Sequence, residues 1–203
     1  MNYYEKIITE IKQHDVEIFN ATYVDGKNIF VKIADFSDET ITLLVKWRNE
    51  CGDWFDSKFD ASFENTKNWF NDKILNDKQR ILFLIIFNNN KIGHFGLDCY
   101  NEKENSVFIT DVIRGEKGFA PGLMEIIFKN YILWIQKKFK ISIIKLRVFQ
   151  DDKKALELYK KCGFKKKYSI PMCKKLSNNG WKWLEMVGND KNPERYFDVM
   201  EFR

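Results

Sequence analysis

The sequence predicts one mixed α/β domain, built on a central, largely antiparallel sheet that is flanked by helices. Its 203 residues are enough for one ordinary domain with a real core but too few for two. Apolar residues make up 44% of the chain and aromatic residues 16%, a composition typical of folded proteins. Stretches with helical spacing alternate with short strand-like stretches, in an order that contains both a hairpin and a strand–helix–strand crossover.

The first eighty residues are predicted to hold three helices and one strand. Ile7 and Ile11 recur at helical spacing. Ser37 or Asp38 can cap a second helix, and Ser62 can open a third. Apolar and polar residues alternate over the strand that precedes the second helix. The predicted helices span residues 3–14, 38–50 and 63–75, and the strand spans residues 28–34.

The rest of the chain, from residue 81 on, is predicted to be richer in strands. Residues 81–87 are nearly all apolar and are followed by three asparagines, so they predict a buried strand that a hairpin pairs with residues 91–100. Pro121 suits the first position of a helix because it has no N–H to leave unpaired. Further strands are predicted over residues 107–113, 142–149, 164–170 and 197–202, and further helices over residues 121–139 and 152–161.

Two parts of the chain are predicted to lie outside this regular pattern. Residues 175–193 show the least regular spacing and predict a long surface loop between the last strands. We expect residues 1–28 to form an N-terminal helical extension and residues 29–203 to form the domain itself.

Charge and cysteine usage exclude several classes of protein. The formal charge of +5 is modest and its lysines are spread along the chain, so we expect no nucleic-acid partner. No run approaches the roughly 18 to 20 apolar residues that cross a bilayer, so we expect no membrane partner and a cytoplasmic location. The four cysteines form no CxxC pair and only two histidines are present, which predicts free thiols and no metal site.

The most informative segment is residues 111–124, a predicted strand, a glycine-containing turn and the start of a long helix. This arrangement presents unpaired backbone N–H groups and a positive helix end to an anion. Gly115 and Gly118 are expected to adopt positive φ and to let a phosphate approach the backbone. Arg114 and Lys117 add positive charge beside them.

A second segment, residues 148–164, is a predicted strand that leads into a short helix. Asp152 is placed to cap this helix, and Ala155 and Tyr159 share one of its faces. Gly163 then turns the chain into the next strand. Periodicity alone leaves two interpretations of Tyr159, as a core aromatic or as a functional phenol.

Together the two segments resemble the cofactor-binding halves of GNAT acetyltransferases. Gly118-Phe119-Ala120 matches the end of that superfamily's first motif, although Arg114 stands one residue earlier than its basic residue. Asp152 replaces the usual Asn of the second motif. The second motif is otherwise matched by Ala155, Tyr159, Lys161, Gly163 and Phe164. The resemblance covers about residues 81–164 and extends to helices near residues 43–48 and 62–70.

The resemblance implies acetyl-CoA as co-substrate, without a metal. Tyr159 would protonate the departing thiolate, and a backbone N–H near Val112 or Ile113 would polarise the thioester carbonyl. A general base must take the proton of the amine, and Asp111 is the first choice, with His94 and Asp98 as alternatives on the neighbouring strand. The residues implied to bind the cofactor are Val112, Ile113, Arg114, Gly115, Lys117, Gly118, Phe119, Ala120, Gly122, Asp152, Ala155 and Tyr159.

The resemblance therefore predicts an N-acetyltransferase that acts on a primary amine of a small-molecule acceptor. The loop, together with the Gln-Asp-Asp start of the helix at residue 152, resembles bacterial members that act on amino sugars, often nucleotide-linked, which favours such an acceptor. Trp47-Arg48-Asn49 and Trp69-Phe70 resemble ribosomal-protein-type members instead, which favours the N-terminal amine of a protein. A non-catalytic module that senses CoA is the third alternative, and a homodimer is left open as the oligomeric state.

Overall fold

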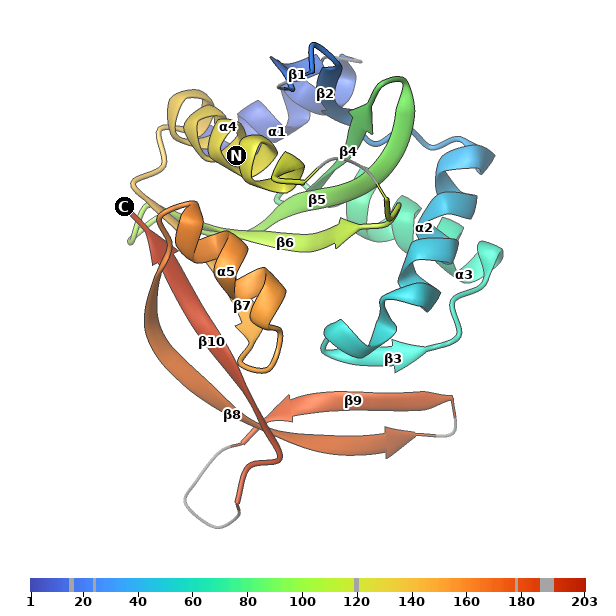
Figure 1. Ribbon diagram of the computed structural model, residues 1–203, viewed down its shortest axis with the longest axis vertical. Coiled ribbons are helices and arrows are strands. Elements are labelled where there is room, and N and C mark those ends of the chain that lie inside the picture. The colour runs from blue at the N-terminus through green and yellow to red at the C-terminus, as the bar shows by residue number, and fades with distance from the viewer. Residues whose placement is uncertain (15–16, 24, 119–120, 178, 187–191) are drawn as a thin grey trace.

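The strands form one ten-stranded mixed sheet in the computed structural model, which describes residues 1–14, 17–23, 25–118, 121–177, 179–186 and 192–203 (Figure 1). The sheet order is β1-β2-β4-β5-β6-β7-β10-β8-β9-β3. The strands are β1 (Glu17–Thr22), β2 (Asn28–Ile33), β3 (Ser57–Phe59), β4 (Ile81–Phe87), β5 (Asn90–Asn101), β6 (Ser106–Arg114), β7 (Ile143–Phe149), β8 (Lys165–Ser177), β9 (Gly180–Glu185) and β10 (Arg195–Phe202). The helices are α1 (Tyr3–Gln13), α2 (Asp38–Glu50), α3 (Phe63–Phe70), α4 (Leu123–Phe139) and α5 (Lys153–Lys161), with a 3-10 turn η1 (Gly52–Trp54) and a π-helical turn η2 (Asn71–Leu75).

One pair of neighbouring strands, β6 and β7, is parallel, and the other pairs within the described ranges are antiparallel. This confirms the predicted mixed, largely antiparallel sheet. The parallel pair is short, because only residues 106–108 of β6 are in register with residues 143–145 of β7. Beyond these residues the two strands diverge toward their carboxyl ends (Figure 1). The sheet is thereby divided into two half-sheets.

Helices cover both faces of the first half-sheet. On one face, here called the α4 side, the largest core packs α1, α4 and α5 against residues of the central strands. On the other, the α2 side, α2, α3 and η2 enclose a second core around Trp47 and Phe70. A third, smaller core of Phe149, Met172, Trp183 and Phe197 lies in the second half-sheet. Within the described part of the chain, no helix combines the length and apolar character needed to cross a bilayer.

The N-terminal helix is integrated into the sheet's core. A capping box between Asn2 and Glu5 starts α1, and its buried face joins the same core as α4. Lys12 donates hydrogen bonds to the carbonyl oxygens of Ile74, Leu75 and Asp77, which ties the end of α1 to η2. The boundary at residue 28 stays a prediction, and β1 pairs across it with β2.

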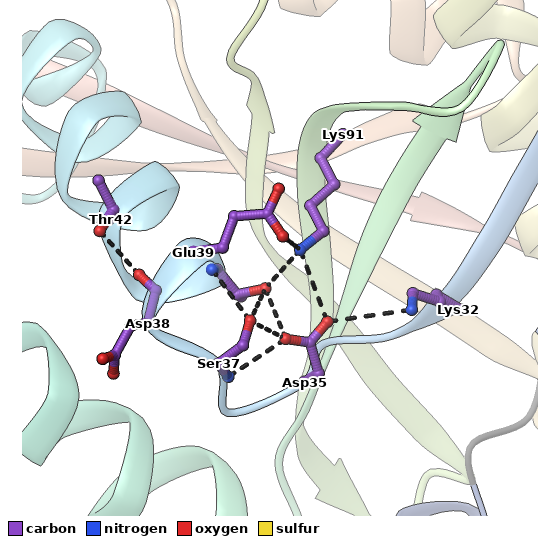
Figure 2. A network of polar contacts seen from close by, with 8 residues as sticks. Lys32, Asp35, Ser37, Asp38, Glu39, Thr42 and Lys91 are labelled. Carbon is purple, nitrogen blue, oxygen red and sulfur yellow. Dashed lines mark hydrogen bonds and ion pairs between the residues drawn. The ribbon is translucent and has the colours of Figure 1, made fainter.

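The start of α2 is fixed by a polar network that Figure 2 shows. Ser37 accepts a hydrogen bond from the Thr40 N–H, which confirms it as the helix cap. The Asp35 carboxylate in turn accepts hydrogen bonds from Ser37 and from the Thr40 hydroxyl (2.8 Å). Lys91 of β5 reaches Glu39 at 2.7 Å and Thr40 at 3.0 Å. The helix is therefore attached to the central sheet at its first turn.

Three predictions about elements were wrong. The edge strands β1 and β3 were not predicted, because a short strand with one neighbour carries little apolar pattern. Residues 175–193 are not a continuous loop, since the end of β8 and β9 pair as a hairpin. Pro121 is not the first helical residue, because α4 begins at Leu123 with Gly122 as its cap.

Candidate functional site

The divergence of β6 and β7 defines the candidate site. Both strands run in the same direction, so their carboxyl ends lie at the same edge of the sheet. Ligands of α/β proteins bind beyond the carboxyl ends of parallel strands, where neighbouring strands separate. The segment after β6 leads to α4 and the segment after β7 leads to α5. The two segments singled out in the sequence are therefore brought together at one edge.

A β-bulge interrupts β6 beside this opening. His94 is opposite Ile113 and Gly96 is opposite Thr110, so Asp111 and Val112 together face one residue of β5. Asp111 has a φ of 51°, which is rare for a residue other than glycine. A bulge leaves its extra residue outside the ladder of backbone hydrogen bonds. A main-chain amide is thus available where the resemblance implies that a thioester carbonyl is polarised.

Gly115 serves a different purpose from the one predicted. Its φ is not positive, and a Cβ at this position would lie 2.2 Å from the indole of the buried Trp47. The side chain of Glu116 faces the same helix, accepting hydrogen bonds from Trp47 Nε1 (2.9 Å) and Lys46 (2.7 Å). The beginning of the loop is therefore held against α2, and the expected positive φ at Gly115 was wrong.

The next residues of the loop are open to a ligand. Gly118 and Gly122 have φ values of 89° and 77°, and a Cβ at either would meet no atom of the described residues within 4 Å, apart from its chain neighbours. Gly122 caps α4 without any side-chain hydrogen bond to the helix start. Glu125 and Ile126 donate their main-chain N–H to the Gly122 carbonyl, whereas the amides of Leu123 and Met124 have no partner among the described residues, and Lys117 is exposed in the same loop. Phe119 and Ala120, also predicted to bind the cofactor, lie outside the described residues.

On the other side of the opening, Asp152 caps α5 by accepting a hydrogen bond from the Ala155 N–H at 3.0 Å. This confirms the predicted cap. Tyr159 is buried in the α4-side core, with its ring 5.4 Å from that of Phe128. Burial raises the pKa of Tyr159, so its phenol keeps its proton. The ring is a core aromatic, and the acid role of its hydroxyl stays a prediction.

The predicted base, Asp111, belongs to a charged cluster on the α2 side. Arg80, at the start of β4, donates to Asp111 Oδ2 at 2.7 Å, and its Nε lies 3.6 Å from Asp98 Oδ2. Thr110 donates to the same Asp111 oxygen at 3.1 Å. The Arg80 guanidinium also lies 5.4 Å from the ring centre of Trp69. Asp111 Oδ1 makes no hydrogen bond within the described residues, so one carboxylate oxygen remains open.

His94, the alternative base, is buried beside Trp47, with ring centres 5.9 Å apart. Burial lowers the pKa of His94 to about 4, although the Asp111 carboxylate and a hydrogen bond to the Asp111 main chain act in the opposite direction. The imidazole is therefore neutral near pH 7. Its Nδ1 is buried without a hydrogen-bond partner among the described residues.

Arg80 belongs to the charged cluster of Asp111, and Arg48 supports the loop that follows α2; the sequence assigns neither of them a place in the site. Arg48 donates to the Ser57 carbonyl at 2.8 Å and its guanidinium stacks on Phe55 at 3.9 Å. Asn49 holds the same loop, donating to the Ala61 carbonyl at 3.1 Å. The Trp-Arg-Asn stretch resembles ribosomal-protein-type members, but nothing in the sequence connects it to this loop, and Arg80 has no local signal at all.

Two open surface hollows lie between the η1–β3 segment and the β8–β9 hairpin, with volumes of about 390 Å³ and about 530 Å³. Trp181 lines both of them. Neither is lined by the residues predicted to bind the cofactor. No group of three metal-ligating side chains lies together in the part of the chain that the structure describes.

Known structures share this architecture. No protein-family model matches the sequence, and no curated protein matches it. Spermidine N-acetyltransferase from Vibrio cholerae, solved with CoA and spermine, superposes with a TM-score of 0.68 at 14% identity over 86% of this chain and 94% of that one. An acetyltransferase of the GNAT family from Bacillus anthracis gives 0.65 at 15% identity over 92% and 98%. The Salmonella typhimurium enzyme that modifies the N-terminal serine of ribosomal protein L7/L12 gives 0.65 at 12% identity over 86% and 94%. The chain therefore has the fold of the GNAT acetyltransferases.

Proposed function

We propose that this protein is an acetyl-CoA-dependent N-acetyltransferase that transfers an acetyl group to a primary amine. The observation that carries the proposal is the separation of β6 from β7, with a bulge on one strand and an open helix start after it. Neighbours of the same fold were solved with CoA bound, which supports the cofactor.

The loop after β6 is suited to hold the diphosphate of CoA. Gly118 and Gly122 leave the backbone accessible, and the start of α4 offers amides and a positive dipole. Arg114 and Lys117 add positive charge. Because Glu116 is turned away toward Lys46 and Trp47, its carboxylate does not oppose a phosphate. The main chain of Val112 and Ile113 would line the pantetheine, with Ala155 and Asp152 across the opening.

The residues around the bulge would then perform the transfer. A main-chain amide at Val112 would stabilise the negative charge that develops on the carbonyl oxygen. The open Oδ1 of Asp111 would take the proton of the attacking amine, while Arg80 holds the carboxylate in place. Tyr159, which burial keeps protonated, would donate a proton to the sulfur that leaves.

Calorimetry with acetyl-CoA, followed by thiol detection with a panel of amines, tests the proposal. We expect saturable binding, and thiol release that depends on one class of amine. Lys117→Glu should weaken acetyl-CoA binding, whereas Lys137→Glu, an exposed charge near the far end of α4, should not. Tight binding without thiol release from any amine would favour the CoA-sensing alternative, and no binding would refute both.

Two classes of acceptor remain as alternatives, namely a small amino sugar and the N-terminal amine of a protein. The resemblance of Trp47-Arg48-Asn49 to ribosomal-protein-type members does not separate them, because these residues support the loops around the site. Spermidine must also be tested, since a neighbour of this fold is a spermidine N-acetyltransferase. The panel therefore needs an amino sugar, a nucleotide-linked amino sugar, a peptide with a free N-terminus and spermidine.

A further inference from the structure

Residues 93–96 of β5 lie directly beside the bulge of β6. Gly93 is paired with Arg114 at one end of the bulge, and Gly96 is paired with Thr110 at the other. The bulge carries the main-chain amide and the carboxylate that the proposed transfer uses. Its shape therefore matters for the chemistry, and β5 is the strand in contact with it.

The two glycines allow β5 to approach its neighbours more closely than a side chain would permit. A Cβ at Gly93 would lie 2.2 Å from the carbonyl oxygen of Ile113 and 3.2 Å from the Cα of Arg114. A Cβ at Gly96 would lie 2.7 Å from the carbonyl oxygen of Ile81 on β4. Real Cβ atoms essentially never make contacts below 3.0 Å, so a side chain at either position would push the strands apart.

Gly96 also leaves room for the carboxylate of the bulge. A Cβ there would lie 3.3 Å from Thr110 Oγ1 and 3.5 Å from Asp111 Oδ2. The same Oδ2 accepts hydrogen bonds from Arg80 and from Thr110. These bonds fix the carboxylate, but they leave the main chain of the bulge to be held by another group.

His94 lies between the two glycines in the strand and is that other group. Its side chain is 5% exposed, and its ring centre lies 5.9 Å from that of Trp47. The imidazole forms a hydrogen bond with the main chain of Asp111. Because Nδ1 has no hydrogen-bond partner among the described residues, this bond uses Nε2.

The acceptor of this bond determines which nitrogen carries the proton. Burial lowers the pKa of His94, and the bond to Asp111 opposes that effect, as a bond donated to a carbonyl oxygen does. A carbonyl oxygen only accepts, so Nε2 is the protonated nitrogen of the neutral ring and Nδ1 carries the lone pair. That lone pair is buried. The ring is therefore placed to donate a hydrogen bond and not to take the proton of an amine.

A fixed Asp111 carbonyl also determines the direction of the next amide. The peptide bond between Asp111 and Val112 is trans, so its C=O and N–H point in opposite directions. With the carbonyl toward His94, the Val112 N–H points away from that ring, and the opening beside β7 lies on the side of β6 opposite β5. The φ of 51° at Asp111 is costly for a residue other than glycine and persists only where its surroundings support it.

We propose that His94 is a positioning residue of the transfer, whose Nε2–H holds the Asp111 carbonyl and thereby directs the Val112 N–H toward the carbonyl oxygen of the thioester. Gly93 and Gly96 let β5 come close enough for this bond. His94 acts through the main chain of β6 and touches no reacting atom. The inference rests on the proposed function, because the thioester of that reaction is the group that the amide meets.

Two substitutions distinguish a hydrogen-bond donor from a residue that only packs. Glutamine can place an amide N–H near the position of Nε2, whereas leucine fills a similar space without a donor. With the amine that supports thiol release, His94→Leu should lower kcat by about a hundredfold, the effect of losing one donor to a developing oxyanion. His94→Gln should retain most of the activity. Ile74→Ala, which opens a cavity in the same α2-side core, is the control for lost stability and should keep kcat.

A second readout needs no acceptor. Isotope-edited infrared spectroscopy records the C=O stretch of acetyl-CoA, labelled at the thioester carbonyl and bound to each protein. A hydrogen bond to that oxygen lowers the stretching frequency. We expect a lowered frequency in the unaltered protein and in His94→Gln, and the frequency of free acetyl-CoA in His94→Leu. NMR of the ligand-free proteins should show a displaced Val112 amide resonance in His94→Leu only.

The outcomes separate this inference from the proposed function. If His94→Leu and His94→Gln lose kcat equally, the donor role is overturned and the transferase stands. If neither loses more than Ile74→Ala and the Val112 resonance is unchanged, His94 only packs and the inference is wrong. If acetyl-CoA binds to none of the proteins, the proposed function fails and the aim at a thioester fails with it. A Val112 resonance displaced in His94→Leu alone would then still show that His94 fixes the bulge.

Discussion

Tyr159 illustrates how one environment can serve both packing and chemistry. Its ring lies against Phe128 and Phe164 in the largest core, and burial raises the pKa of its phenol. A phenol that stays protonated cannot act as a base, but it remains available as a proton donor. Negative charge develops on the sulfur as the carbon–sulfur bond breaks, and that is the step in which a proton from Tyr159 would be needed.

Tyr159→Phe should lower kcat by about a hundredfold and leave the dissociation constant of acetyl-CoA unchanged, since one general acid typically contributes this much. Tyr131→Phe is the matched control, because Tyr131 is a buried phenol of the same core whose hydroxyl has no partner among the described residues. Steady-state kinetics and calorimetry on both variants decide the matter. An unchanged kcat in Tyr159→Phe would remove its acid role.

His94 should make the stability of the protein depend on mildly acidic pH. Its pKa is about 4 when folded and 6.5 as the ordinary value, so between these values the unfolded chain binds a proton that the folded chain does not. Stability should therefore fall as the pH falls from about 6.5 to about 4, by roughly 3 kcal/mol at most. Urea unfolding at pH 7 and pH 4.5 measures this loss. The His94→Gln variant has no imidazole to titrate, so its free energy of unfolding should fall less between pH 7 and pH 4.5. An equal fall in both proteins would contradict the role of His94 in this pH dependence.

At the scale of elements, α2 depends on its first turn for its position. Ser37 caps the helix, and Asp35 and Lys91 connect that cap to β5 (Figure 2). Ser37→Ala should reduce the free energy of unfolding by about 1 kcal/mol, which is the usual cost of losing a cap. Thr42→Ala removes a hydroxyl that bonds only the Asp38 carbonyl on the exposed side of the same helix, and it should cost less. If both variants lost the same free energy of unfolding, the Ser37 cap would contribute no more to stability than an ordinary exposed hydroxyl of the helix.

The two ends of the cofactor loop should respond differently to the same substitution. Gly115→Ala would drive a Cβ into the buried Trp47, so we expect a loss of about 1 to 3 kcal/mol in unfolding free energy. Gly118→Ala meets open space and should cost about 1 to 2 kcal/mol through its left-handed φ alone. Combining each glycine substitution with Trp47→Phe in a double variant separates the two causes of instability. The smaller ring should partly rescue Gly115→Ala and leave the cost of Gly118→Ala unchanged.

At the scale of the whole molecule, the two half-sheets meet at three residue pairs of β6 and β7. We expect acetyl-CoA to insert at this junction. It should protect main-chain amides at the edge of the junction from exchange, but not those of β1, which is far away. Hydrogen exchange should show added protection over residues 109–114 and 122–126 when acetyl-CoA is present, and no change over residues 17–22. Protection spread evenly over both edges of the sheet would contradict binding at the junction.

Local patterns predicted most of the fold. The β4–β5 hairpin and the β6–α4–β7 crossover follow from apolar runs, asparagine turns and helical spacing within each segment. Strand β3 was missed because its order comes from pairing with distant residues, such as Lys58 with Trp181, and β1 was missed because it is a short edge strand with little apolar pattern. The hairpin of β8 and β9 was hidden because its lysines and tryptophans resemble a polar loop.

Only those features of the candidate site that depend on local sequence were predicted. Asp152 as a cap and Gly118 with positive φ follow from local rules, and the structure confirms them. The bulge at Asp111, the ion pair of Arg80 and the contact of Trp47 with Gly115 join residues that are far apart in the chain. No spacing rule reaches across such distances.

The contact between Trp47 and Gly115 links the two sides of the site mechanically. Trp47 touches the cofactor loop, while the next two residues, Arg48 and Asn49, support the loop at Ser57 and Ala61. One rigid turn of α2 therefore bears on both loops at once. We therefore expect a ligand that shifts one loop to change the affinity of the other loop for its own ligand, and by thermodynamic linkage any such effect would be equal in both directions.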